Sequence, residues 1–222
     1  MIFQLFKCRF SLAGENMDKR KIALTLLLTL VLATTTALAG TYTSYIIVAH
    51  GHSGDAGEIP STGKNQQLYA KATLLVPNSW AYIVIKTPQE TVSSGRYKVK
   101  VTAYVTMYWN VRSAYPGGQG SSLIYLGVRV PGKWSETKLV WDDTPSPGNE
   151  ITRNGYSKVL TYVSTRTVSS GDKIEAILEW YGLAYGPTSG SDISRVVRFV
   201  NGHWTYALLQ VHYIEIEYIP AD

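Results

Sequence analysis

RYKVKVTAYVTMYW, residues 96–109, has the clearest structural pattern in the chain. Apolar side chains fall on every second residue, and lysine, threonine or tyrosine fills most of the positions between them. Because successive side chains of a β-strand point to opposite faces, this alternation predicts a strand with one packed and one wet face. No stretch of residues 40–222 has the 3.6-residue period of an amphipathic helix. The sequence therefore predicts an all-β domain.

The same reasoning predicts more strands on both sides of this one, at residues 67–76, 80–86, 122–130, 136–141, 157–164, 173–185, 195–200 and 203–219. Pro77-Asn78 separates the first two and predicts a hairpin. Asn201-Gly202 predicts a type I′ turn between the last two, because both residues tolerate positive φ. About ten strands without helices favour a two-sheet β-sandwich of jelly-roll or Greek-key type over a closed barrel.

Two finer features belong to this strand pattern. In the last strand the apolar residues change phase after Tyr213, and a period of two changes phase only through an extra residue, so we expect a bulge near His212. The string TVSSG occurs twice, at residues 91–95 and 167–171, each time just before a predicted strand. We interpret it as a reused turn.

Residues 1–39 are predicted to be a leader with a signal peptide. Lys19-Arg20-Lys21 is a basic region, an apolar run follows to residue 36, and Ala37-Leu38-Ala39 fits a signal-peptidase site. Met17 lies two residues before the basic region and is interpreted as the true start. Cleavage would make Gly40 the first residue of a secreted or cell-surface protein with no membrane attachment. The alternative is a membrane anchor formed by residues 22–39, which could just span a bilayer.

Removing the leader changes the meaning of the composition. Five of the 21 basic residues and two of the 16 acidic residues lie before residue 40, so the net charge falls from +5 to +2. No stripe of lysine and arginine is left to neutralise a row of phosphates, which argues against nucleic acid as a partner. The single cysteine, Cys8, also lies in the leader, so the domain must be held together by its core.

Residues 40–50 are predicted to form an N-terminal strand, residues 51–65 a flexible glycine-rich tether, and residues 66–222 the sandwich domain. The strand is apolar on both of its phases, so we expect it to be covered on both sides. With a tether of this length it could insert into a neighbouring molecule as a donor strand. The alternative is a strand that crosses between the two sheets of its own domain. The residues expected to be buried by a partner are Tyr42, Tyr45, Ile46, Ile47 and Val48.

This layout resembles that of donor-strand filament subunits, namely archaeal bundling pili, archaeal threads, cannulae and the TasA-type biofilm fibres. The resemblance lies in the order of parts: a cleaved signal, a free N-terminal strand, a glycine-rich tether and a tyrosine-rich, cysteine-free sandwich. It implies an extracellular, non-enzymatic homopolymer, with calcium at the subunit contacts. The alternative function is a monomeric module that binds a surface polysaccharide or acts as an adhesin.

Catalytic motifs are absent from the sequence, which has no G-x-S-x-G, H-E-x-x-H or P-loop. Glu175 with Glu179, and Glu215 with Glu217, have strand spacings that place each pair on one face, as a glycosidase requires. Both pairs fall on a predicted outer face, where solvated charges are the simpler interpretation. We therefore predict that the protein is not an enzyme.

Three groups of residues are considered as candidate ligand sites. Asp142, Asp143 and Glu150 supply hard oxygen ligands in a proline-bounded loop and are candidates for calcium, although such a loop can equally be merely solvated. Trp134 and Trp141 lie beside this loop and could stack on sugar rings. His50-Gly51-His52 is the one closely spaced histidine pair, and two imidazoles alone would need further ligands to hold a metal.

Overall fold

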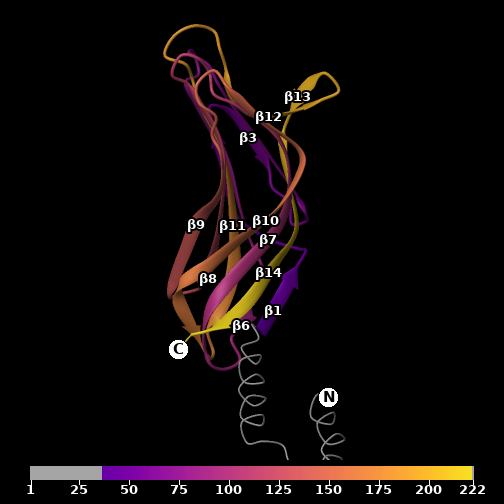
Figure 1. Ribbon diagram of the computed structural model, residues 1–222, viewed down its shortest axis with the longest axis vertical. Helices are drawn as coiled ribbons and strands as arrows, with labels where there is room; N and C mark the ends of the chain where they lie inside the picture. The colour runs from indigo at the N-terminus through magenta and orange to yellow at the C-terminus, as the bar shows by residue number, and fades with distance from the viewer. Residues whose placement is uncertain (1–36, 222) are drawn as a thin grey trace, which may run out of the picture. The chain divides into compact units, whose positions relative to one another are not determined.

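The computed structural model describes residues 37–221, which form fourteen β-strands and no helix (Figure 1). The predicted all-β sandwich is confirmed. The basic region, the apolar run and Met17 of the predicted leader lie outside the described residues, as does Asp222. Nothing between residues 37 and 221 is a helix of the length and hydropathy needed to cross a membrane.

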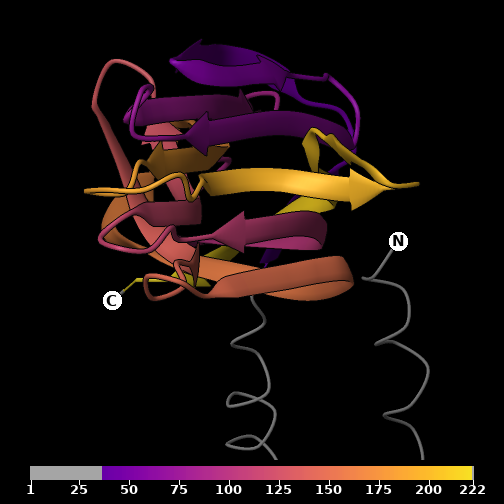
Figure 2. The same ribbon diagram turned by 90° about the horizontal axis from the view of Figure 1, so that it is seen from above.

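The strands pair in two antiparallel sheets, drawn from above in Figure 2. In order, the first sheet contains β1 (Ala37–Tyr42), β14 (Ala207–Pro220), β4 (Asn65–Ala72), β12 (Ser194–Val200), β7 (Arg96–Arg112) and β10 (Glu150–Ser169), with β3 (Asp55–Ile59) paired to β4 and β13 (His203–Thr205) to β12. The second contains β2 (Ile46–Ser53), β5 (Asn78–Lys86), β11 (Lys173–Tyr185), β8 (Gln119–Val130) and β9 (Trp134–Asp143), with β6 (Glu90–Thr91) paired to β11.

The core lies between the inner faces of the two sheets. Trp109 of β7 packs on Trp180 of β11 with ring centroids 5.6 Å apart, and the Trp180 indole donates a hydrogen bond to Ser122 Oγ at 3.0 Å. The apolar positions predicted along residues 96–109 are buried here. The largest fully buried side chains are Trp109, Trp180, Leu68, Ile83, Ile85, Met107, Ile124, Leu126, Ile174, Leu178, Leu209 and Ile214.

Two local predictions are confirmed. Asn201 and Gly202 both have positive φ, 50° and 81°, and they join β12 to β13 as a tight hairpin. The rest of the strand predicted at residues 203–219 is not part of this hairpin: it forms β14, which pairs with β4 and β7. In the β14–β7 pairing the register shifts between Val211 and Tyr213, so His212 is the extra residue of a bulge. In each case the prediction rested on a few neighbouring residues: a turn dipeptide, or a change in which face of the strand carries the apolar side chains.

The predicted hairpin of residues 67–76 and 80–86 is wrong. β4 belongs to the first sheet and β5 to the second, so the chain changes sheet between them. Thr73 organises this crossing: its N–H donates to the Val76 carbonyl, and its Oγ1 accepts from the Leu75 and Val76 N–H groups. Five residues make this link, more than a tight two-residue turn has, and they carry the chain from one sheet to the other.

The predicted flexible tether at residues 51–65 is also wrong over most of its length. Residues 51–53 complete β2, and residues 55–59 are β3, which pairs with β4. Gly51 is opposite Tyr82 and Gly57 is opposite Tyr69, and a Cβ at either glycine would lie 3.2 Å or 2.9 Å from the tyrosine ring. The glycines make room for aromatic rings that cover the strand, a known way of stabilising glycine in sheets.

The N-terminal segment is divided between the two sheets. β1 pairs with β14 in the first sheet, and β2 pairs with β5 in the second. Between them Tyr45 is buried, 3% exposed, and its hydroxyl lies 3.2 Å from the carbonyl oxygens of Tyr42 and Val211. The segment thus pairs within its own chain and crosses between its own sheets, which is the alternative weighed above.

The two TVSSG copies lie side by side. Gly171 N donates to the Val92 carbonyl, Val92 N donates to the Asp172 carbonyl, and Ser170 N donates to the Gly95 carbonyl. Both glycines have positive φ, 86° at Gly95 and 85° at Gly171. The repeated turn therefore forms a paired cap at one end of the sandwich.

Candidate ligand-binding site

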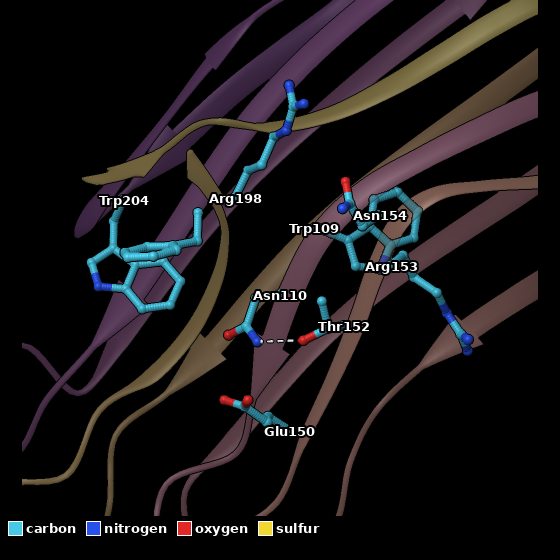
Figure 3. Close-up of a pocket in the computed structure, with 9 residues that line it drawn as sticks. Trp109, Asn110, Glu150, Thr152, Arg153, Asn154, Arg198 and Trp204 are labelled. Carbon is cyan, nitrogen blue, oxygen red and sulfur yellow. Dashed lines mark hydrogen bonds between the residues drawn. The ribbon is translucent and has the colours of Figure 1, made fainter. Parts of the chain in front are cut away.

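A groove of about 300 Å³ opens on the outer face of the first sheet, beside the β12–β13 hairpin (Figure 3). Its wall is the hairpin, and its floor comes from β7 and β10, which pair with each other at this point. The residues that line it are Trp109, Asn110, Glu150, Thr152, Arg153, Asn154, Arg198, Phe199 and Trp204.

The wall of the groove is aromatic and exposed. Phe199 and Trp204 are opposite each other in the hairpin register, with ring centroids 4.6 Å apart, and they remain 56% and 44% exposed. The Arg195 guanidinium lies 4.2 Å from the centre of the Trp204 ring. The indole is therefore held in place without being covered.

The floor is polar and already ordered by hydrogen bonds. The Asn110 side chain donates to Thr152 Oγ1 at 2.9 Å, the bond drawn in Figure 3, and accepts from Arg195 Nε at 3.0 Å. A second Arg195 nitrogen, Nη2, lies 3.3 Å from Glu150 Oε2. Since the amide is fixed at both ends, the floor presents donors and acceptors in defined positions.

Arg153 and Arg198 both line the groove, but of the two only Arg153 forms an ion pair among the described residues. Arg153 makes a two-pronged ion pair with the buried Asp143, at 2.7 and 3.0 Å, and this contact raises the pKa of the guanidinium. In Figure 3 its side chain turns away from the centre of the groove. Within residues 37–221, Arg198 forms no ion pair, and its guanidinium lies 4.6 Å from the Tyr108 ring centre.

A second hollow, of about 230 Å³, lies on the other side of Trp204. It is lined by Tyr69, Lys71, Val197, Trp204, Thr205 and Tyr206. Tyr69 and Tyr206 meet edge to face with centroids 4.9 Å apart, and Lys71 Nζ lies 5.6 Å from the Tyr69 ring centre. Trp204 thus lines both hollows.

The residues proposed for calcium are not brought together as ligands. Both Asp143 oxygens are occupied by Arg153, and Trp109 Nε1 donates to Oδ2 at 2.9 Å. Asp142 accepts from Thr144, and Glu150 faces Arg195. Across residues 37–221, no three His, Cys, Asp or Glu side chains are placed to hold one metal ion.

The tryptophans proposed for sugar stacking lie apart from each other. Trp134 and Trp141 are at opposite ends of β9, roughly 23 Å apart at about 3.3 Å per residue. Trp141 packs against Tyr156 with Arg153 over its ring, and neither tryptophan lines the groove. The exposed aromatic pair is instead Phe199 and Trp204. The exposure of these two rings could have been predicted from the sequence, because side chains beside the two-residue Asn-Gly turn cannot reach the core.

Other predicted residues also lie outside the groove. Of the N-terminal strand residues, Tyr42 contacts Glu90, Ile47 is partly buried, and Ile46 and Val48 are 45% and 42% exposed on β2.

Three of the four paired glutamates have side-chain partners of their own. Glu175 is buried, and not solvated as predicted, and its Oε1 lies 2.7 Å from Lys86 Nζ. Burial raises the pKa of Glu179, which accepts from the Tyr181 hydroxyl. Glu217 lies 2.8 Å from Lys100.

The two closely spaced histidines share one carboxylate. His50 Nδ1 and His52 Nδ1 lie 3.0 and 2.6 Å from the two oxygens of Glu58.

No protein-family model matches this chain, and no curated protein matches it. Among solved structures, the CBM22-1 xylan-binding domain of Paenibacillus barcinonensis Xyn10C is 10% identical over 86% of this chain and 99% of its own, with a TM-score of 0.28. The module TmCBM61 in complex with β-1,4-galactotriose is 10% identical over 68% and 88%, with a TM-score of 0.22. Likenesses this slight assign neither a family nor a ligand.

Proposed function

We propose that the protein is a secreted, non-enzymatic β-sandwich module that binds polysaccharide on the outer face of its first sheet. The observation that carries this proposal is the exposed pair Phe199 and Trp204 above a floor of pre-oriented polar groups. Large rings left exposed on a short hairpin gain nothing for the core, so their exposure favours a ligand.

The chemistry of the groove matches the chemistry of a sugar. A pyranose ring has an apolar face of C–H groups and a rim of hydroxyls, so it needs an aromatic surface and several fixed hydrogen-bonding groups. Trp204 supplies the first, and Asn110, Thr152 and Glu150 supply the second. A groove lined in this way binds and orients a chain, and no pair of its residues forms an acid–base arrangement.

Affinity electrophoresis through gels containing soluble polysaccharides tests the proposal. Trp204→Ala should weaken retardation at least about tenfold, the cost typical of truncating a central aromatic contact. Trp80→Ala is the matched control, because Trp80 is 40% exposed but lies on β5 of the second sheet. Loss of retardation in both variants, or in neither, would remove the groove from the proposal.

A filament subunit is the second candidate function. It is favoured by Ile46 and Val48, which are exposed on β2, the strand at one edge of the second sheet among the described residues. An exposed apolar edge strand is suited to pairing with another copy of the chain. Negative-stain microscopy of the secreted protein tests this function directly.

A further inference from the structure

Each of the two hollows beside Trp204 is lined by one cationic residue that forms no ion pair among the described residues. Arg198 lines the first hollow and Lys71 the second, and neither forms an ion pair with any residue between 37 and 221. Asp55 is opposite Lys71 in the β3–β4 register and still makes no ion pair with it. Within residues 37–221, neither positive charge is therefore compensated by an ion pair.

The three arginines beside these hollows, in contrast, form ion pairs. Arg112 pairs with Asp192 at 3.1 Å, Arg153 with Asp143 at 2.7 Å, and Arg195 with Glu150 at 3.3 Å. Glu150 is the one carboxylate among the residues that line either hollow, and it belongs to one of these pairs. The surplus charge of the two hollows is therefore positive and sits at Arg198 and Lys71.

The two hollows lie along one line across the sheet. Beside the hollows, the order of neighbouring strands in the sheet is β10, β7, β12 and β4. Their register is set by the Asn110–Val197 pair and the Lys71–Arg195 pair. At about 4.8 Å per strand these four strands cover roughly 14 Å, enough for several linked sugar rings. Trp204 stands between the hollows, so a chain lying along this line passes over the indole.

From this geometry we infer that the polysaccharide is acidic, and that it spans both hollows with one carboxylate or sulfate near Arg198 and another near Lys71. The inference rests on the proposed function and adds the class of sugar. Arg198 suits this role because a guanidinium stacked on a tyrosine ring keeps its N–H edge free for an anion.

A matched pair of polymers tests the charge without changing the backbone: polygalacturonate and its fully methyl-esterified form. Alginate and chondroitin sulfate extend the acidic set, and xylan and β-1,4-galactan extend the neutral set. Wild-type protein should bind at least one acidic polymer at least about tenfold more tightly than its esterified or neutral counterpart, and rising salt should weaken that binding.

Arg198→Gln and Lys71→Gln should each reduce binding to the acidic polymer several-fold. Lys173→Gln should not, because Lys173 is an exposed lysine on β11 of the second sheet. Equal binding of acidic and neutral polymers, with Trp204→Ala still harmful, would overturn the charge inference and keep the proposed function. Binding to none of these polymers would overturn both. Acidic binding that is unaffected by Arg198→Gln and Lys71→Gln would also overturn the inference.

Discussion

At the scale of single residues, Asp143 is the clearest case of a side chain whose role is structural. It is buried beside Trp109 and Arg153, and among the described residues its carboxylate hydrogen-bonds to those two side chains alone. Removing one partner of a buried ion pair leaves an uncompensated charge, which typically costs about 3–5 kcal/mol. Asp143→Ala should therefore lower the free energy of unfolding by roughly that amount, measured by urea denaturation with or without calcium.

Asp142→Ala is the control for this prediction, because Asp142 is exposed and bonds to Thr144 alone among the described residues. Its effect should be within about 0.5 kcal/mol of zero. If calcium raised the melting temperature of the wild type and chelator lowered it, the loop would bind the ion after all, and the assignment of Asp143 to Arg153 would be incomplete.

At the scale of elements, the β12–β13 hairpin carries the aromatic wall of the groove. Gly202 has a φ of 81°, and a left-handed conformation costs a residue with a Cβ about 1–2 kcal/mol. Gly202→Ala should weaken polysaccharide binding, because the strain loosens the turn that positions Trp204. The melting temperature should change little, since β13 is exposed.

Gly132→Ala is the control, because it introduces the same kind of backbone strain in a different turn. Gly132 has a φ of 77°, has open space around its Cβ position, and lies in the turn between β8 and β9. It should leave binding unchanged. Equal loss of binding in both glycine variants would mean that general destabilisation, and not the hairpin, accounts for the effect.

The paired TVSSG cap predicts a pH dependence. A hydrogen bond from Lys133 Nζ at 2.5 Å, and a second from Ser169 N–H, lower the pKa of Asp172 below its ordinary value. A group with a lowered folded-state pKa stabilises the fold above its unfolded pKa, about 3.9, and loses that contribution as pH falls through the folded value. Asp172→Asn should thus lower the melting temperature at pH 7, and the difference should shrink below about pH 4. A difference that grew on acidification would contradict the assignment.

Sequence features confined to a few neighbouring residues predicted local structure correctly. The errors arose at residues whose contacts come from distant parts of the chain. Asn201-Gly202 and the phase change at His212 each specify a turn or bulge by their own chemistry. Gly51 and Gly57 indicated a tether because the tyrosines that cover them are on other strands. The proposed calcium residues are held apart for the same reason, because Arg153 and Trp109 reach Asp143 from β10 and β7.

At the scale of the whole molecule, the N-terminal segment decides between a self-contained domain and a polymer. Replacing Ile46 and Val48 with Asp should leave the melting temperature nearly unchanged, because both side chains are exposed, and should abolish filaments if the wild type forms them. Tyr45→Ala should instead destabilise the monomer by about 3–5 kcal/mol, because Tyr45 belongs to the core. A stable monomeric Tyr45→Ala variant would show that the segment does not belong to its own domain.

The start of the mature chain is a separate prediction at this scale. Cleavage after Ala39 leaves Gly40, Thr41 and Tyr42 paired to β14, so the first sheet keeps its edge strand in shortened form. Mass spectrometry of the secreted protein should find Gly40 as the first residue. Protein that retains the basic region at residues 19–21 would favour the membrane anchor.

Sugar binding beside Trp204 can be followed directly, because the chain has six tryptophans, each with one indole N–H signal. The experiment is a ¹⁵N NMR titration of the protein with oligosaccharides from whichever polysaccharide retards it most strongly. We predict that the Trp204 indole signal moves progressively, whereas those of Trp80 and Trp134, on the second sheet, stay in place. A stationary Trp204 signal alongside a moving Trp80 or Trp134 signal would contradict the account.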